Sequence, residues 1–254
     1  MKPPKLLLLL WYCFTSLTTF AQTPKSIEAD LLKSFKRISY WDQQDGDVKY
    51  DSLIAANKTF GTKLKRYTEK HPFTINYPFT TLKKEKLKIA TSANGLFRIY
   101  SWNTELGGTM YSFSNVMQYK VGSKTYSKLF ESGENGFMPY YDALCSIQNN
   151  GKVYYIGVFW GTESSRYHYE GIKMFTIDNS VLKELKIIKT AKGLNSTISY
   201  DYDTTFFRDY KSIPKIVFDG DKGQISLPVV AENGKMTNKY TTYKFTGKYF
   251  EKVK

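Results

Sequence analysis

The spacing of apolar residues divides the chain into a helical part and a strand-rich part. Between Thr23 and Lys70, apolar side chains recur at steps of three and four residues, which is the period of one helix face. One such face contains Ile27, Leu31, Leu32, Phe35 and Ile38, and the next contains Leu53, Phe60, Leu64 and Tyr67. A polar turn, DQQDGD at 42–47, separates them. We therefore expect a helical hairpin over residues 22–70, with Thr23 and Pro24 opening the first helix and Asp51 capping the second.

The pattern changes after the predicted hairpin. Residues 71–85 contain Pro72 and Pro78, which argue against a regular helix and against a central strand, so an extended linker is expected there. Residues 86–254 are rich in β-branched and aromatic residues, with turn signals about every 8 to 12 residues, as in all-β domains. This part is predicted to be one antiparallel β domain.

Three successive segments of the β domain share a plan of four strands. The middle copy, 138–190, has a second strand, KVYYIGVFWG, that is apolar on both alternating faces, as in a strand covered on both sides. The three copies end in matching hairpins, YKV-GSK-TY, FTI-DNS-VL and YKF-TGK-YF. Their last strands are rich in lysine, which suits the outer edge of a sheet.

The fold class predicted from these patterns is mainly β. It consists of an N-terminal helical hairpin followed by about twelve antiparallel strands in three four-stranded meanders, a number that the spacing of strand and turn signals suggests. Meanders of this kind form propeller blades, but closed propellers usually have at least four blades. A barrel and a sandwich of packed sheets therefore stay open as alternatives.

The N-terminus has the pattern of a signal peptide. A basic start, MKPPK, precedes LLLLLWYCFTSL, an apolar run shorter than the roughly 20 residues that span a membrane. Thr19 and Ala21 then present small residues at the cleavage positions, so residues 1–21 are predicted to be removed. No later apolar run is long enough to span a membrane. The expected location is outside the cytoplasm, either periplasmic or extracellular.

The net charge favours anionic partners other than nucleic acid. The chain carries +14, and removal of Lys2 and Lys5 with the signal peptide leaves +12. Only five of the basic residues are arginine, and the lysines are spread along the chain. Base and phosphate recognition usually relies on arginine, whereas dispersed positive charge suits an anionic envelope lipid or polysaccharide. Cys145 would be the only cysteine left, so no intramolecular disulfide is expected.

Catalytic signals are weak. His168 could act as a general base oriented by Glu163 or Glu170, but it is predicted to lie in a surface loop, and no nucleophile motif such as GxSxG is present. Cys145 could be a nucleophile paired with His168. Its context, ALCSI, is more typical of a small buried hydrophobic residue. We therefore assign no catalytic residue.

A glycan site is one hypothesis for binding, and an anionic envelope component is another. Trp102, Trp160, Tyr167 and Tyr169 lie near predicted turns and could stack on sugar rings, or they could belong to the core. The candidate binding residues are Trp102, Trp160, His168 and Glu170. Glycoside hydrolysis would need two facing carboxylates, and the sequence does not select a pair among Glu105, Glu131, Glu134, Asp142, Glu163, Glu170 and Asp203. It leaves open whether Trp160 shares a pocket with the loop after Trp102.

Metal binding has one weak candidate. Two histidines and one cysteine are too few for a zinc site of the usual composition. Asp219 and Asp221 lie two residues apart in a glycine-containing turn, which suggests calcium, although the distal glutamate of a complete calcium loop is absent and Asp-Gly is common in ordinary turns. No other cofactor is expected.

Two segments resemble a known group of sequences. RIYSWNT at 98–104, followed by GGTM at 107–110, and the tail at 225–250 are similar to motifs in uncharacterised secreted proteins of Bacteroidota-type bacteria. The resemblance implies export and brings no known activity. The function expected from the sequence is a non-catalytic binding or envelope-associated module, and the alternative is a secreted hydrolase acting on polysaccharide or peptide.

Overall fold

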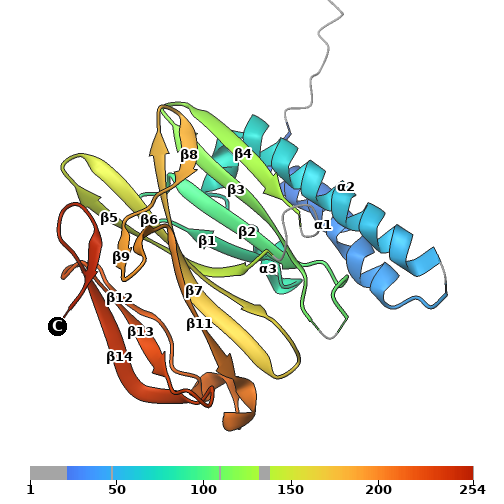
Figure 1. The fold of residues 1–254 in the computed structure, drawn as a ribbon. Helices are drawn as coiled ribbons and strands as arrows, with labels where there is room; N and C mark the ends of the chain where they lie inside the picture. The colour runs from blue at the N-terminus through green and yellow to red at the C-terminus, as the bar shows by residue number, and fades with distance from the viewer. Residues whose placement is uncertain (1–21, 47, 109, 132–137, 254) are drawn as a thin grey trace, which may run out of the picture.

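The protein consists of a helical layer and three sheets packed face to face (Figure 1). The computed structural model describes residues 22–46, 48–108, 110–131 and 138–253. The predicted signal peptide at 1–21 and the candidate Glu134 lie outside the described residues. The helices pack on the first sheet, the first sheet packs on the second and the second packs on the third, although residues 197–203 return to the second sheet after residues 188–195 have joined the third.

The helical hairpin is present as the sequence predicts. It is formed by α1 (Pro24–Asp42) and α2 (Val48–Lys70). The Thr23 hydroxyl accepts a hydrogen bond from the Ser26 amide at 3.1 Å, and Pro24 lies in the first turn, which confirms the predicted start. The second start is corrected: α2 begins at Val48, and Asp51 lies inside its first turn, where a carboxylate interacts favourably with the helix dipole.

The segment 71–85 is not extended, contrary to the prediction. It contains η1 (Pro72–Ile75) and the short helix α3 (Thr80–Lys84). Proline at the start of a helical turn loses no hydrogen bond. The buried Glu28 carboxylate of α1 accepts hydrogen bonds from the Thr81 and Leu82 amides at 2.7 and 3.2 Å. Because these contacts satisfy backbone donors at the start of α3, one turn of helix is stable there.

The first sheet is the meander that the sequence predicts. Its strands are β1 (Lys88–Thr91), β2 (Phe97–Asn103), β3 (Phe113–Val121) and β4 (Lys124–Phe130), hydrogen-bonded in that order. The lysine-bearing β4 lies at the edge, as expected. One face of this sheet contacts the helices, and the other contacts the second sheet.

The second and third sheets depart from the repeated plan. The second contains β5 (Tyr140–Asn149), β6 (Lys152–Thr162), β7 (Tyr167–Asp178), β8 (Val181–Glu184) and β11 (Thr197–Asp203). The third contains β9 (Ile188–Thr190), β10 (Gly193–Asn195), β12 (Val217–Asp219), β13 (Gln224–Val230), β14 (Met236–Phe245) and β15 (Phe250–Lys252). The third sheet has the order β10-β9-β15-β14-β13-β12.

The lysine-rich fourth strand of the middle copy is therefore split. Its first part, β8, pairs with β7, whereas its second part, β9, joins the third sheet and pairs with β15 in parallel. As a result, β15 is not the edge strand that the lysine pattern suggested. The described part of the chain is mainly β, and most of its strands are antiparallel, as predicted. Its sheets form neither a closed barrel nor a propeller. Packed sheets are the alternative that the structure supports.

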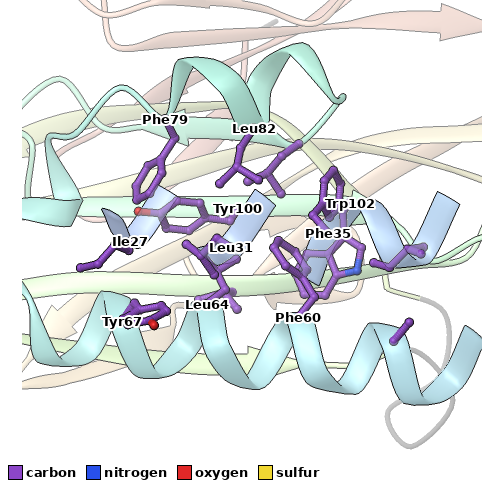
Figure 2. Close-up of a cluster of buried hydrophobic side chains, with 14 of the residues drawn as sticks. Ile27, Leu31, Phe35, Phe60, Leu64, Tyr67, Phe79, Leu82, Tyr100 and Trp102 are labelled. Atoms are coloured by element: carbon purple, nitrogen blue, oxygen red, sulfur yellow. The ribbon is translucent and has the colours of Figure 1, made fainter. Parts of the chain in front are cut away.

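The hydrophobic core between the helices and the first sheet is dense in aromatic residues (Figure 2). Phe60 lies edge-on to Trp102, with ring centroids 5.1 Å apart. The Trp102 indole donates a hydrogen bond to the Asn57 side-chain oxygen at 3.0 Å, and the Asn57 amide donates to the Thr104 carbonyl at 2.8 Å. Asn57 therefore ties α2 to the end of β2 through polar bonds inside an apolar layer. Within the described residues, no helix is both long enough and apolar enough to cross a membrane.

The Asn57→Ala substitution should destabilise the fold. It removes the acceptor for the buried Trp102 indole and the donor for the Thr104 carbonyl, and unsatisfied buried groups each cost about 1–3 kcal/mol. We expect a lower urea midpoint with an unchanged slope. Lys58→Ala, on the exposed side of the same helix, is the control and should leave the midpoint unchanged. Equal midpoints for the two variants would contradict the role of Asn57.

Candidate functional site

A pocket of about 440 Å³ opens at one end of the second sheet. We call it the aromatic pocket, and its lining residues are Tyr111, Tyr140, Asp142, Trp160, His168, Glu170, Tyr202 and Lys215. This volume falls in the range of small-molecule sites. The pocket lies on the face of the second sheet that packs against the third sheet, where the same face of β6 and β7 buries Ile156 and Ile172.

Strand register brings the pocket residues together. Tyr140 of β5 lies opposite Trp160 of β6, Trp160 lies opposite Glu170 of β7, and Glu170 lies opposite Tyr200 of β11. These four side chains form one row across four strands. His168 and Tyr202 form part of the next row. Since residues i and i+2 of a strand share a face, His168 and Glu170 are both directed to the pocket side.

The Glu170 carboxylate is buried and held by three donors. One of its oxygens, Oε2, accepts a hydrogen bond from the Tyr200 hydroxyl at 2.9 Å. The other, Oε1, accepts from the Tyr202 hydroxyl at 3.1 Å and from the Lys215 ammonium at 3.0 Å. Burial, and then the nearby Glu170 charge, raise the pKa of Tyr200 far above its ordinary value. Glu170 therefore fixes β11 and Lys215 against β7.

His168 lies inside the pocket wall and not in a surface loop. It is on β7, only 5% exposed, and its ring is stacked near Trp160 with centroids 6.2 Å apart and planes 24° apart. Burial lowers its pKa, while the Glu170 carboxylate acts in the opposite direction. The expectation of an exposed loop histidine is corrected, because the β6–β7 hairpin extends its strands from Thr162 and Tyr167.

Two irregular features complete the pocket. A β-bulge between Tyr141 and Ala143 places Asp142 as the extra residue of β5, and its carboxylate is paired with the Lys88 ammonium at 2.9 Å. The loop between β2 and β3 contributes Tyr111, whose amide donates to the Thr162 hydroxyl at 2.8 Å. The loop after Trp102 thus does share a pocket with Trp160, through Tyr111. Bulges often redirect side chains next to functional sites.

The predicted binding residues divide into two groups. Trp160, His168 and Glu170 line the aromatic pocket. Trp102 does not: it is 1% exposed and packs in the core against α2, so we withdraw it as a candidate. The physical reason is that β2 is covered by helices on the face that carries Trp102, which the sequence of β2 alone does not reveal.

The other candidates lie outside the pocket. Cys145 is packed partly into the core between the second and third sheets, and burial raises the pKa of its thiol. Asp203 is buried and paired with Arg166. Asp219 accepts from the Lys222 amide and pairs with the Lys222 ammonium at 2.9 Å, so its carboxylate is already occupied. In the part of the chain that the structure describes, no group of three or more potential metal ligands is present.

Several pocket residues were not predicted from the sequence. Tyr111, Tyr140, Tyr202 and Lys215 were not singled out, and Asp142 was one of several acids that could not be ranked. The segment TISYDYD, which forms β11, does alternate between apolar and polar residues, and this period of two was a usable strand signal. Lys215 lies in an irregular segment before β12, and no local pattern identifies it.

Comparison of the chain with family models, with curated proteins and with solved structures found no match.

The His71→Gln variant allows the pKa of His168 to be measured directly, because the chain has two histidines. We expect the ring protons of His168 to titrate below pH 6.5, the ordinary value, since burial disfavours the charged ring. Below about pH 6.5 the unfolded chain therefore binds more protons than the folded chain does. The stability contribution of His168 is therefore present above that pH and is lost as the pH falls.

Two measurements check this expectation. An NMR titration of His71→Gln should give a midpoint below 6.5. The urea midpoint of His71→Gln should fall between pH 7 and pH 5.5 more steeply than that of the double variant His71→Gln/His168→Gln. A titration midpoint at or above 6.5 would show that the Glu170 charge outweighs burial.

Proposed function

We propose that this protein is an exported, non-catalytic module that binds a carbohydrate in the aromatic pocket. The observation that carries the proposal is the convergence of three aromatic rings with polar groups in one concave site. Trp160 lies next to Tyr140 and Tyr111, with ring centroids 5.4 and 6.1 Å apart. Ligand sites combine apolar walls with a few placed polar groups in this way.

The chemistry of the wall suits a sugar ring. The C–H faces of a pyranose are apolar and pack against aromatic faces, whereas its hydroxyls need hydrogen-bond partners at the edge. Tyr111 is 48% exposed, so its ring is available to a ligand. Burial, followed by the Asp142 charge, raises the pKa of Tyr140 to about 12, and its hydroxyl is therefore a neutral donor and acceptor at neutral pH.

The state of the carboxylates supports binding over catalysis. Glu170 is 6% exposed, and both of its oxygens already accept hydrogen bonds. Asp142 is paired with Lys88. A general acid or base must reach the reacting group in a suitable protonation state, and Glu170 instead has the contacts of a residue that holds the pocket wall in place.

Export is supported by the signal-peptide pattern of residues 1–21 and by the resemblance of the 98–110 and 225–250 segments to secreted Bacteroidota-type proteins. The positive net charge of the chain would favour contact with anionic envelope components, and this attraction would weaken as salt increases. These features motivate the choice of envelope polysaccharides as the first ligands to test.

A hydrolase is the second candidate, because Asp142, Glu170 and His168 line the same pocket. Two carboxylates in one cleft are the usual requirement for glycoside hydrolysis. The two proposals differ in one observable result, which is whether a bound oligosaccharide is cleaved.

Trp160→Ala should abolish most carbohydrate binding. We expect a glycan array to identify a ligand and calorimetry to show a loss of roughly 30-fold in affinity for the variant, since removal of a central aromatic anchor costs about 2 kcal/mol or more. Tyr50→Ala, which removes an exposed aromatic residue of α2, is the matched control and should bind as the unchanged protein does. Equal carbohydrate affinity of Trp160→Ala and Tyr50→Ala would contradict the proposed site.

The same ligand distinguishes the hydrolase. If the protein is a binding module, the oligosaccharide stays intact during prolonged incubation. Sustained release of products that is lost in Glu170→Gln while the folded state is retained would replace the proposed function with the second candidate.

A further inference from the structure

A second concave site lies on the opposite face of the second sheet from the aromatic pocket. It is a groove of about 530 Å³ between the first and second sheets, and it shares no lining residue with the aromatic pocket. Its lining comes from β3 and β4 on one side and from β5, β7, β8 and the two residues before β5 on the other. We call it the inter-sheet groove.

The floor of the inter-sheet groove is apolar. Its apolar lining residues are Met117, Phe130, Met138, Pro139, Tyr141, Phe175 and Leu182. Met117, Tyr141 and Phe175 are buried members of the core between the two sheets, whereas Phe130 and Leu182 are only partly buried at its margin. The groove is thus a place where the core between the sheets reaches the surface.

The floor offers little to a polar ligand. Asn115, the amide side chain of the lining, is 1% exposed. Its side-chain oxygen accepts from the Ser101 hydroxyl at 2.5 Å, and its amide donates to the Pro139 carbonyl at 2.9 Å. The side-chain amide of Asn115, which could orient a sugar or an extended peptide, is therefore already used.

The rim of the groove is positively charged. Lys128, Lys173 and Lys183 line it together with one acid, Glu184. Lys173 is paired with Glu184 at 2.6 Å, and Lys183 is paired with Asp178 at 3.0 Å in an exposed pair. The Lys128 ammonium lies 4.8 Å from the centre of the Phe130 ring and makes no ion pair with any described residue.

We propose that the inter-sheet groove binds a single acyl chain with a carboxylate headgroup, that is, a long-chain fatty acid. The hydrocarbon would lie on Met117, Phe130 and Leu182, and the carboxylate would lie at the rim near Lys128 and Lys183. The apolar floor and the excess of lysine at the rim match the two ends of such a ligand. This inference does not depend on carbohydrate binding, because the two sites have no residue in common.

The test uses calorimetry with octanoate, decanoate and dodecanoate, each below its micelle-forming concentration. We expect one saturable site whose affinity rises roughly fourfold per methylene group, the increase that burial of a CH₂ group provides. Decanol should bind at least tenfold more weakly than decanoate, because it lacks the charge that the lysines recognise. Absence of saturable binding, or equal affinity of decanol and decanoate, would overturn the proposal.

Variants locate the site. Lys128→Gln/Lys183→Gln should weaken dodecanoate binding at least tenfold, and Leu182→Gln should also weaken it. Lys58→Gln/Lys239→Gln removes two exposed lysines elsewhere and is the charge-matched control, which should bind as the unchanged protein does. Thermal unfolding of every variant should show a single unchanged transition. If Trp160→Ala and not the groove variants abolished dodecanoate binding, the fatty acid would occupy the aromatic pocket and the proposal would fail.

Discussion

The fold depends on covering both faces of each inner sheet. In β6, Tyr155 and Phe159 pack toward the first sheet, and Tyr154 and Ile156 pack toward the third. In β2, Ile99 belongs to the core with the second sheet, and Trp102 belongs to the core with the helices. Strands that are apolar on both faces cannot be exposed to water without a large loss of hydrophobic stabilisation. The stacking of layers follows from this constraint, and the helical hairpin closes the stack at one end.

The aromatic pocket lies where the third sheet no longer covers the second sheet. Along β7, Ile172 and Met174 are covered by the third sheet, but His168 and Glu170 lie nearer the start of the strand, where the pocket lining includes Lys215 and Tyr202. Burying a carboxylate there requires several donors, and β11 supplies two of them. A residue larger than glycine would not fit at position 171, because its Cβ atom would lie only 2.5 Å from the Ile198 carbonyl oxygen of β11. The close approach of β11 to β7 thus depends on a glycine beside Glu170.

Local elements can be predicted well from this sequence, whereas the assignment of strands to sheets cannot. The two-sided strand β6, the helical hairpin and the meander of the first sheet were all predictable, because each is encoded in the period of its own residues. The splitting of VLKELKIIK into β8 and β9 was not predictable, since it depends on pairing between Phe250 and Ile188, which are distant in sequence. For the same reason Trp160, His168 and Glu170 were identifiable as candidates, whereas Tyr202 and Lys215 depend on the placement of β11 and of the segment before β12.

A single strand connects the two proposed sites. On β7, His168 and Glu170 are directed to the aromatic pocket, while Lys173 and Phe175 are directed to the inter-sheet groove. The alternation of side chains along a strand would therefore allow one strand to serve the two proposed ligands, which differ in chemistry. On the groove face the floor is apolar and lysine supplies the charge at the rim, whereas on the pocket face each lining acid is paired with a lysine. Because both linings include residues of β7, the two proposed sites would lie on opposite faces of one strand.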